Sequence, residues 1–297
     1  MSSAERAATL LPSLDPREIR VLQGIELGMA QHEFVPISEI VHYSGLVEAE
    51  VKHWIDELDL KDFLWGMSGA QVGYILNYNS YDLLALNALV RGNVIDALGM
   101  PIGMGKEADV FKALTPKGET VAIKFHRLGR VSFRRTRQKR EFIGKKRQLS
   151  WLYQSRLAAE REYAALTAAR DAMVPVPLPI SQNRHTVVMG YVEGHQFSEA
   201  VLDEPGVFLD EILGYVAKGY AAGFVHNDLS EFNILVTDDG SVYIIDWPQY
   251  VARGTRNYEE ALGKDVANIL RYFERKYRIK RDLEETLKVV RTAPRLS

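Results

Sequence analysis

The chain has 297 residues, of which 46% are hydrophobic and 26% charged, so it is long enough for one large core or for two domains. It contains no cysteine, which excludes a disulfide framework and a thiolate metal site. No apolar run is long enough to cross a bilayer, and the first residues lack the pattern of a secretory signal. We therefore expect a cytoplasmic protein without a membrane partner.

The net charge of −2 hides an uneven distribution of charge along the chain. Residues 1–90 carry five Lys/Arg against thirteen Asp/Glu, whereas residues 127–147 carry ten Lys/Arg and a single acid, Glu141. Residues 271–297 are basic again, with nine Lys/Arg and four acids. Blocks of charge this well separated predict different surfaces for different partners.

Residues 1–90 are predicted to form helices followed by a short hairpin. Asp15-Pro16 is typical of a helix start, with proline at the first helical position. A second helix, a tight turn at 44–46 and a third helix over 47–58 with one apolar face follow. Two helices joined by a glycine turn form the helix-turn-helix outline. The alternating segment 66–78 adds a hairpin, so we predict a winged helix-turn-helix domain.

The remainder, residues 91–297, is predicted to form a second domain. Residues 81–98 are expected to form a connecting helix, and a glycine-rich segment follows at 99–105. Strands, a basic insertion, a helix over 155–170 and further strands and helices come next. This order is an α+β arrangement.

The first of four motifs is a glycine-rich loop. Residues 102–110 read IGMGKEADV and match the kinase loop G-x-G-x-x-G-x-V that covers the phosphates, with alanine at the third glycine position. Glycines allow backbone amides to approach phosphates closely. The candidate nucleotide-binding residues here are Gly103, Gly105, Lys106, Glu107, Ala108 and Val110. The segment is not a Walker loop, and by itself it is equally consistent with an ordinary glycine turn.

The second motif is VAIK at residues 121–124, which is the third-strand motif of kinases. Its lysine, Lys124, is expected to reach the α- and β-phosphates of ATP, and it needs a carboxylate to hold it. Glu162 is our choice, and Glu160 is a rival on another face of the same helix. Taken alone, Lys124 is equally a solvated strand lysine.

The third and fourth motifs supply carboxylates and an amide. Residues 226–233 read HNDLSEFN and correspond to the catalytic loop H-R-D-L-x-x-x-N. Asp228 is predicted to orient the acceptor and take its proton. Residues 244–248 read IIDWP and place Asp246 at a strand end, like the D-F-G aspartate that binds magnesium. Each motif alone also fits an Asx-rich turn or a helix cap, but the four in this order predict a phosphotransferase.

Phosphoryl transfer requires positioning of the substrates and neutralisation of phosphate charge. Asn233 and Asp246 offer the oxygen ligands that a hard cation prefers, so the expected cofactors are ATP and Mg²⁺, for which Mn²⁺ can substitute. The catalytic residues are predicted to be Asp228, Lys124 and Asp246.

A hinge between two lobes is expected at about residues 190–194. It separates an N-lobe over about 91–189 from a C-lobe over about 195–297. Backbone groups near Tyr191 and Val192 would bond adenine, and Met189 is either an adenine contact or simply core.

The strings GKEADV at 105–110, LSEFN at 229–233 and IDWP at 245–248 resemble those of the RIO family of atypical serine/threonine protein kinases. Within that family the chain resembles the branch that carries an N-terminal winged helix. The family usually has glycine at the position of Asn227 and phenylalanine at that of Trp247. The resemblance covers nearly the whole chain. It implies a bilobal, truncated protein-kinase-like domain that acts in maturation of the small ribosomal subunit.

Whether such a domain acts as a kinase or as an ATPase is left open. Only about fifty residues follow Asp246, which leaves no room for the usual peptide-binding helices. Water or the enzyme itself then becomes the expected phosphate acceptor, and a phospho-Asp246 intermediate is one route. A small-molecule phosphotransferase and a winged-helix module on an inactive kinase scaffold are the alternatives.

The expected partners are the precursor of the small ribosomal subunit and its rRNA, contacted through the basic segment 127–147. That segment is predicted to be a mobile arm, in which Ser132 or Thr136 is a candidate for autophosphorylation. The third helix of the winged helix, over 47–58, carries four acids against one lysine and one histidine, which repels phosphate. We therefore expect this domain to bind protein rather than nucleic acid.

Overall fold

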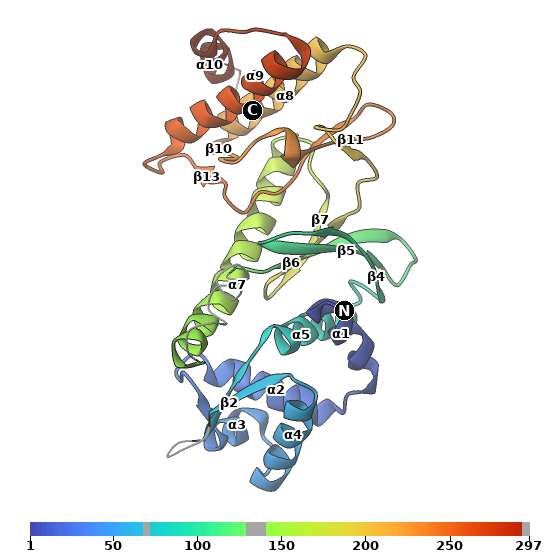
Figure 1. Cartoon of the computed structure of the whole chain (residues 1–297), viewed down its shortest axis with the longest axis vertical. Helices are drawn as coiled ribbons and strands as arrows, with labels where there is room; N and C mark the ends of the chain where they lie inside the picture. Colours follow the sequence, from blue (N-terminus) through green and yellow to red (C-terminus); the bar gives the residue numbers. More distant parts are fainter. Residues whose placement is uncertain (68–71, 129–140, 293–297) are drawn as a thin grey trace. The chain divides into compact units, whose positions relative to one another are not determined.

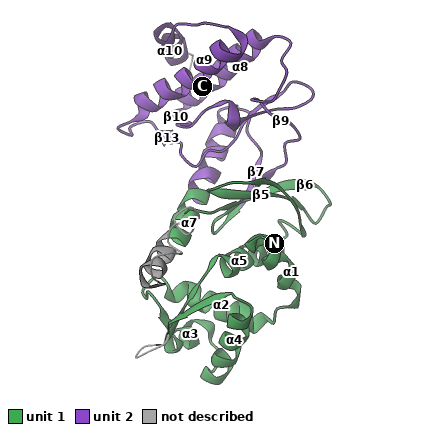
Figure 2. Cartoon of the chain, in the orientation of Figure 1, with its two compact units in different colours: residues 1–159, 182–188 green, residues 160–181, 189–297 purple. Residues whose placement is uncertain are grey.

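The computed structural model describes residues 1–67, 72–128 and 141–292, with side chains in the helix over 141–171 described from residue 151 onward. By its contacts the chain divides into two compact units (Figure 2). Unit 1 consists of residues 1–159 and 182–188, and unit 2 of residues 160–181 and 189–297. The predicted winged helix therefore shares unit 1 with the first strands of the predicted N-lobe.

Unit 1 begins with helices and a small antiparallel sheet of order β1-β3-β2 (Figure 1). The elements in chain order are α1 (Ser3–Leu10), η1 (Leu11–Ser13), α2 (Pro16–Gly28), β1 (Val35–Pro36), α3 (Ile37–Ser44), α4 (Glu48–Leu60), β2 (Leu64–Met67), β3 (Gly73–Leu76) and α5 (Tyr78–Arg91). Helices α2 to α4 followed by the β2–β3 hairpin confirm the predicted winged helix.

Local sequence explains the ends of these helices. The Asp15 carboxylate accepts a hydrogen bond from the Arg17 N–H at 2.8 Å, and the Glu18 carboxylate accepts one from the Asp15 N–H at 2.9 Å, so α2 begins with a capping box. Gly45 ends α3 with φ of 63°, a left-handed conformation that costs other residues strain. Val51 and Leu58 of α4 are fully buried, as the predicted apolar face requires.

Helix α5 differs from the expected connecting helix over 81–98. It spans Tyr78–Arg91, and Ala97 already begins the first strand of the large sheet. Its N-terminus is set by Asn77, whose side chain accepts from the Ser80 N–H at 3.2 Å. Helix α5 packs against α1, and α1 also contacts the first strand of the large sheet, which ties the N-terminal helices to it.

The large sheet has five strands in the order β4-β5-β6-β8-β7. Its strands are β4 (Ala97–Met104), β5 (Ala108–Leu114), β6 (Thr120–His126), β7 (Pro179–Asn183) and β8 (Thr186–Gly190). Strands β4, β5 and β6 pair antiparallel, with bulges in β4 before its glycine-rich end. Helix α7 (Glu141–Asp171) separates β6 from β7 in the sequence and begins 14 residues before the expected start at Ser155.

Unit 2 is mainly helical and also contains a two-stranded and a three-stranded sheet. Its remaining elements are β9 (His195–Gln196), α8 (Pro205–Ala222), β10 (Phe224–Val225), η2 (Glu231–Asn233), β11 (Ile234–Val236), β12 (Val242–Ile244), β13 (Val251–Ala252), α9 (Tyr258–Tyr277) and α10 (Leu283–Thr292). Helices α8, α9 and α10 pack on one another around buried Leu213, Leu262 and Leu287. Within the described ranges, no helix combines the length and apolarity needed to cross a membrane.

A fully buried ionic cluster connects α5 to the large sheet within unit 1. Arg127, directly after β6, makes a bidentate ion pair with Asp82 of α5, at 2.5 and 2.7 Å. Its Nε donates to Asp109 of β5 at 3.0 Å. The His185 ring meets Asp82 at 2.7 Å and Arg127 at 3.0 Å. Arg127 opens the basic segment that we expected to contact RNA, but it is only 1% exposed and therefore does not belong to a solvated arm.

Candidate active site

The glycine-rich loop joins β4 to β5 in unit 1. Gly103 faces Val110 in the strand register, and the Gly105 N–H donates to the Ala108 carbonyl at 2.8 Å. A Cβ on Gly105 would lie 3.1 Å from that carbonyl oxygen, whereas one on Gly103 would meet nothing closer than 3.9 Å. Within unit 1, a side chain at 105 would therefore be crowded, whereas one at 103 would not.

The tip of this loop is tied to the end of β6. The Arg127 N–H donates to the Glu107 carbonyl at 2.6 Å. Both Lys106 and Glu107 are exposed, while Val110 lies opposite Lys124 in the β5–β6 register. Lys124 is only 7% exposed, so its interpretation as a solvated strand lysine is wrong. A buried ammonium requires polar partners, which is the property expected of a functional lysine.

Glu162, the predicted partner of Lys124, belongs to unit 2. It is 1% exposed, and its Oε1 accepts a hydrogen bond from the Trp247 N–H at 3.3 Å. Helix α7, which carries Glu162, thus contacts Trp247, the residue directly after Asp246. The rival Glu160 is partly exposed. The pairing of Lys124 with Glu162 stays a prediction.

Unit 2 brings three predicted site residues together through short hydrogen bonds. The Asn233 Nδ2 donates to the Asp228 carbonyl at 2.9 Å, and the Asn233 carbonyl accepts from the Ile245 N–H at 2.9 Å. Ile245 immediately precedes Asp246. Asp246 has φ of 67° and Asn227 has φ of 68°, a left-handed region that residues other than glycine seldom occupy. Such conformations persist only where the surroundings enforce them, and they concentrate at functional sites.

Asp265 of α9 contacts the predicted catalytic loop, and the motifs did not reveal it. Its two carboxylate oxygens accept from the Asn227 N–H at 2.7 Å and the Leu229 N–H at 2.9 Å, one on each side of Asp228. Burial raises the pKa of Asp265 above its ordinary value, although these hydrogen bonds oppose the rise. The available signal was an aspartate at a core position of an amphipathic helix, next to the buried Val266.

His226 and Lys264 complete the surroundings of the loop. The His226 Nε2 lies 3.0 Å from the Ile245 carbonyl, and its ring packs on Trp247 with centroids 4.5 Å apart. The Lys264 Nζ donates to the Asn227 carbonyl at 3.0 Å and lies 3.7 Å from an Asp228 carboxylate oxygen. Lys264 was also missed, because it follows the catalytic loop by more than thirty residues in the sequence.

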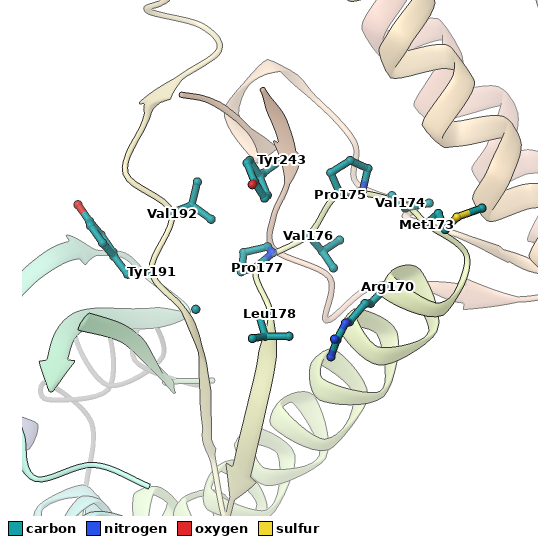
Figure 3. A pocket seen from close by; sticks show the side chains of 11 residues that line it. Arg170, Met173, Val174, Pro175, Val176, Pro177, Leu178, Tyr191, Val192 and Tyr243 are labelled. Atoms are coloured by element: carbon teal, nitrogen blue, oxygen red, sulfur yellow. The ribbon is translucent and has the colours of Figure 1, made fainter. Parts of the chain in front are cut away.

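A cavity of about 450 Å³ lies at the predicted hinge of unit 2 (Figure 3). Tyr191 and Val192 lie across it from the segment Pro175–Leu178. Gly190 is fixed there by its N–H, which donates to the Leu178 carbonyl at 2.8 Å. Met189 is 8% exposed, in agreement with its interpretation as core. The predicted site residues Asp228, Asn233 and Asp246 do not line this cavity.

The side-chain oxygen atoms of Asn233 and Asp246 suit a magnesium ion that also binds phosphate. Among the described residues, no group of three or more His, Cys, Asp or Glu side chains forms a ready metal site. Asn233 and Asp246 offer two oxygen donors, and Mg²⁺ commonly takes one or two protein ligands together with phosphates and water. The arrangement therefore suits a metal that arrives with a nucleotide.

The winged helix, the glycine loop and the catalytic loop define a protein-kinase-like phosphotransferase, and comparisons with known proteins identify its family. The model of the RIO domain matches residues 109–286, and the model of the Rio2 N-terminal domain matches residues 11–92. The chain therefore belongs to the RIO family of serine/threonine protein kinases, in its Rio2 branch.

Relatives and solved structures agree with this assignment. The RIO-type serine/threonine-protein kinase Rio2 of Methanocaldococcus jannaschii is 38% identical over 266 residues, covering 86% of this chain and 96% of the relative. The serine/threonine-protein kinase rio2 of Dictyostelium discoideum is 36% identical over 265 residues, which are 89% of this chain but 51% of that protein. The crystal structure of the Rio2 kinase-ADP/Mg²⁺-phosphoaspartate complex from Chaetomium thermophilum has a TM-score of 0.85 at 30% identity, covering 97% of this chain and 90% of that one. These matches confirm the predicted family and fold class.

Proposed function

We propose that this protein binds ATP with Mg²⁺ and transfers or hydrolyses the γ-phosphoryl group, with Asp228 as the catalytic carboxylate. The observation that carries the proposal is the pair of hydrogen bonds through Asn233, which link Asp228 to the strand end that carries Asp246. They tie the main chain of Asp228 to Asn233 and to the strand end before Asp246, so the acceptor-side carboxylate and the two metal-side oxygen donors come from connected segments. Phosphoryl transfer is catalysed mainly by such positioning and by charge neutralisation.

Each remaining site residue has a role in this proposal. The glycine loop covers the phosphates, and Lys124, held by Glu162, pairs with the α- and β-phosphates. Asn233 and Asp246 hold the magnesium ion, which offsets phosphate charge when it is bound. Tyr191 and Val192 offer backbone groups to adenine. The buried state of Lys124 and Glu162 supports this assignment, because unpaired buried charges are costly.

We further propose that turnover is mainly hydrolysis and passes through a phosphorylated Asp246. The Asp246 carboxylate attacks the γ-phosphorus, the bond to the ADP oxygen breaks, and ADP leaves. Water then attacks the same phosphorus, Asp228 takes the proton of the water, and phosphate leaves the regenerated carboxylate. The Chaetomium relative, whose structure is described as a complex with phosphoaspartate, supports this route.

ATP turnover by purified full-length chain tests the site. Asp228→Asn and Asp246→Asn are each expected to lower turnover by about 10³-fold or more, as removal of a catalytic carboxylate typically does. Asp238→Asn is the matched control, because Asp238 is 95% exposed on the β11–β12 turn of the same unit. Wild-type hydrolysis by a folded Asp246→Asn variant is incompatible with the assignment.

The chemistry of the label separates the two routes. Protein labelled from γ-phosphate-labelled ATP is treated with hydroxylamine, to which acyl-phosphates are labile and phosphoserine is resistant. Hydroxylamine-labile label that disappears in Asp246→Asn is expected. If all label resists hydroxylamine, the enzyme is a serine or threonine kinase without the covalent step.

We also propose that the partner is the precursor of the small ribosomal subunit, approached through the basic segment 127–147. Most of that segment lies outside the described residues, and the described Arg127 is not one of the contacts. Binding of precursor rRNA should weaken steeply with salt. Neutralising Arg134, Arg135, Arg137, Lys139 and Arg140 together should remove most of it, and unchanged binding would exclude the segment. The exposed face of α4, with Glu48 and Asp56 on it, is proposed to contact protein.

A further inference from the structure

The catalytic loop contains no cation of its own. Residues 226–233 include two acids and no lysine or arginine. Glu231 is paired with Arg275 at 2.8 Å, and the neighbouring Asp265 accepts two backbone N–H groups. Asp228 also has a cation of α9 beside it, and it differs from Glu231 in being the proposed catalytic carboxylate.

That neighbour is Lys264 of α9. Its Nζ lies 3.7 Å from an Asp228 carboxylate oxygen, and both side chains are about half exposed, at 50% and 46%. An exposed pair at this distance contributes little to stability. Stability is therefore a weak reason for placing a lysine at this position.

Hydrogen bonds to the catalytic loop fix both the backbone next to Lys264 and the tip of its side chain. Its neighbour in the sequence, Asp265, is fixed by hydrogen bonds to the catalytic loop, and its own Nζ donates to the Asn227 carbonyl at 3.0 Å. An ammonium group has three donors. One is used on Asn227 and one can point toward Asp228, which leaves a third for a group bound in front of the loop.

We propose that Lys264 is a catalytic residue of the phosphoryl transfer. It contacts the transferred phosphoryl group from the acceptor side and also orients Asp228. The inference rests on the proposed function, because it takes Asp228 as the acceptor-side carboxylate. The phosphorus moves from the ADP oxygen to the Asp246 carboxylate and then to the oxygen of a water molecule, and in that second step a proton of the water goes to Asp228. Lys264 keeps its proton throughout and supplies a fixed positive charge where the charge of the loose transition state is spread.

The variants separate charge from anchoring. Lys264→Gln keeps an N–H donor for the Asn227 carbonyl but removes the charge, and Lys264→Arg keeps the charge. Lys276→Gln is the matched control, because Lys276 is a lysine of the same helix that donates to the carbonyls of Ser198 and Ala200. All variants are made in the full chain. Each is measured at a temperature at which its thermal unfolding curve shows it to be folded.

Turnover and two binding constants are then measured. Lys264→Gln is expected to lower kcat about 10²-fold, as loss of one transition-state donor does, while Lys264→Arg recovers most of it. ADP should bind with unchanged affinity, whereas ADP with aluminium fluoride, a mimic of the transferred phosphoryl group, should bind less tightly by a factor similar to the loss in kcat. Lys276→Gln should behave as wild type in all three measurements.

Two results would overturn the proposal. If Lys264→Gln turns over like wild type while Asp228→Asn is inactive, Lys264 only anchors the loop and the proposed function survives. If Lys264→Arg is as impaired as Lys264→Gln, the charge is not what matters. Wild-type activity in Asp228→Asn would instead remove the proposed function itself.

Discussion

Two ionic groups of this protein, one in each unit, have opposite surroundings. In unit 1, Arg127 is enclosed with Asp82, Asp109 and His185, all buried to 2% exposure or less. In unit 2, Lys264 and Asp228 are about half exposed at 3.7 Å. A buried charge without partners is costly, so every member of the first group is matched within the protein. An exposed charge is solvated by water, so it costs little free energy when it leaves its protein partner. The pair in unit 2 can therefore contact a substrate.

Breaking the buried group should give the largest loss of stability. Arg127→Met leaves Asp82 and Asp109 buried without their cation and should lower the free energy of unfolding by about 3–5 kcal/mol, as measured by urea denaturation. Arg127→Lys keeps the charge but not the bidentate geometry and should cost less.

A second substitution checks the cause. Arg127→Met/Asp82→Leu removes both the cation and one of the carboxylates, so it should be destabilised by less than the sum of the single changes. A loss below about 1 kcal/mol in Arg127→Met would mean that the cluster is not held by charge.

The same group predicts a pH dependence. Burial, together with the charge of Arg127, lowers the pKa of His185 from 6.5 to about 4, although the hydrogen bond that the ring makes to the Asp82 carboxylate opposes this shift. Because the unfolded chain binds the proton more readily, stability is complete above pH ~6.5 and falls by up to about 1.4 kcal/mol per pH unit as the pH drops toward 4.

The comparison that tests this is His185→Gln, which keeps a hydrogen-bonding side chain next to Asp82 without titrating in this range. Unfolding is measured between pH 4 and pH 7 for both proteins. A flatter profile is expected for the variant, and equal slopes in the two proteins would assign the pH dependence to other groups.

A buried carboxylate beside the exposed pair sharpens the contrast. Asp265→Asn replaces one of the two accepting oxygens by an N–H₂ group, which leaves one backbone N–H without its acceptor and should cost about 1–3 kcal/mol. It should also lower turnover, because those N–H groups flank Asp228. Asn268→Ala, on the same helix, is the comparison, since it removes the hydrogen bond from the Asn268 Nδ2 to the Leu229 carbonyl, at 3.2 Å, and leaves the N–H groups that flank Asp228 bonded to Asp265. Full activity in Asp265→Asn would show that the loop holds its shape without this support.

The smallest effect belongs to an exposed pair in the winged helix. Lys52 and Glu48 of α4 form an i,i+4 ion pair at 2.6 Å with side chains 57% and 63% exposed. Lys52→Ala should change the free energy of unfolding by no more than about 0.5 kcal/mol and leave ATP turnover unchanged. A larger loss would contradict the view that exposure makes such pairs weak.

Much of the architecture followed from local sequence patterns. The spacing of apolar residues and the turn at Gly45 predicted the helices of the winged helix, and Asp15-Pro16 predicted the start of α2. The catalytic motifs predicted a kinase-like domain and three site residues, and the structure joins Asn233 by hydrogen bonds to Asp228 and to Ile245, the neighbour of Asp246. Helix limits were less accurate, because α5 ends at Arg91, where a glycine follows, rather than at residue 98.

The sequence by itself thus determined the fold class, the family and the identity of Asp228, Asn233 and Asp246, since these are written in short contiguous strings. Only the tertiary structure decided that Arg127 is buried rather than part of a basic arm, and that Asp265 and Lys264 support the catalytic loop. The partners in these contacts are 36 to 45 residues apart. Periodicity and motif spacing describe neighbours along the chain, whereas burial and charge pairing depend on which distant segments the fold brings together.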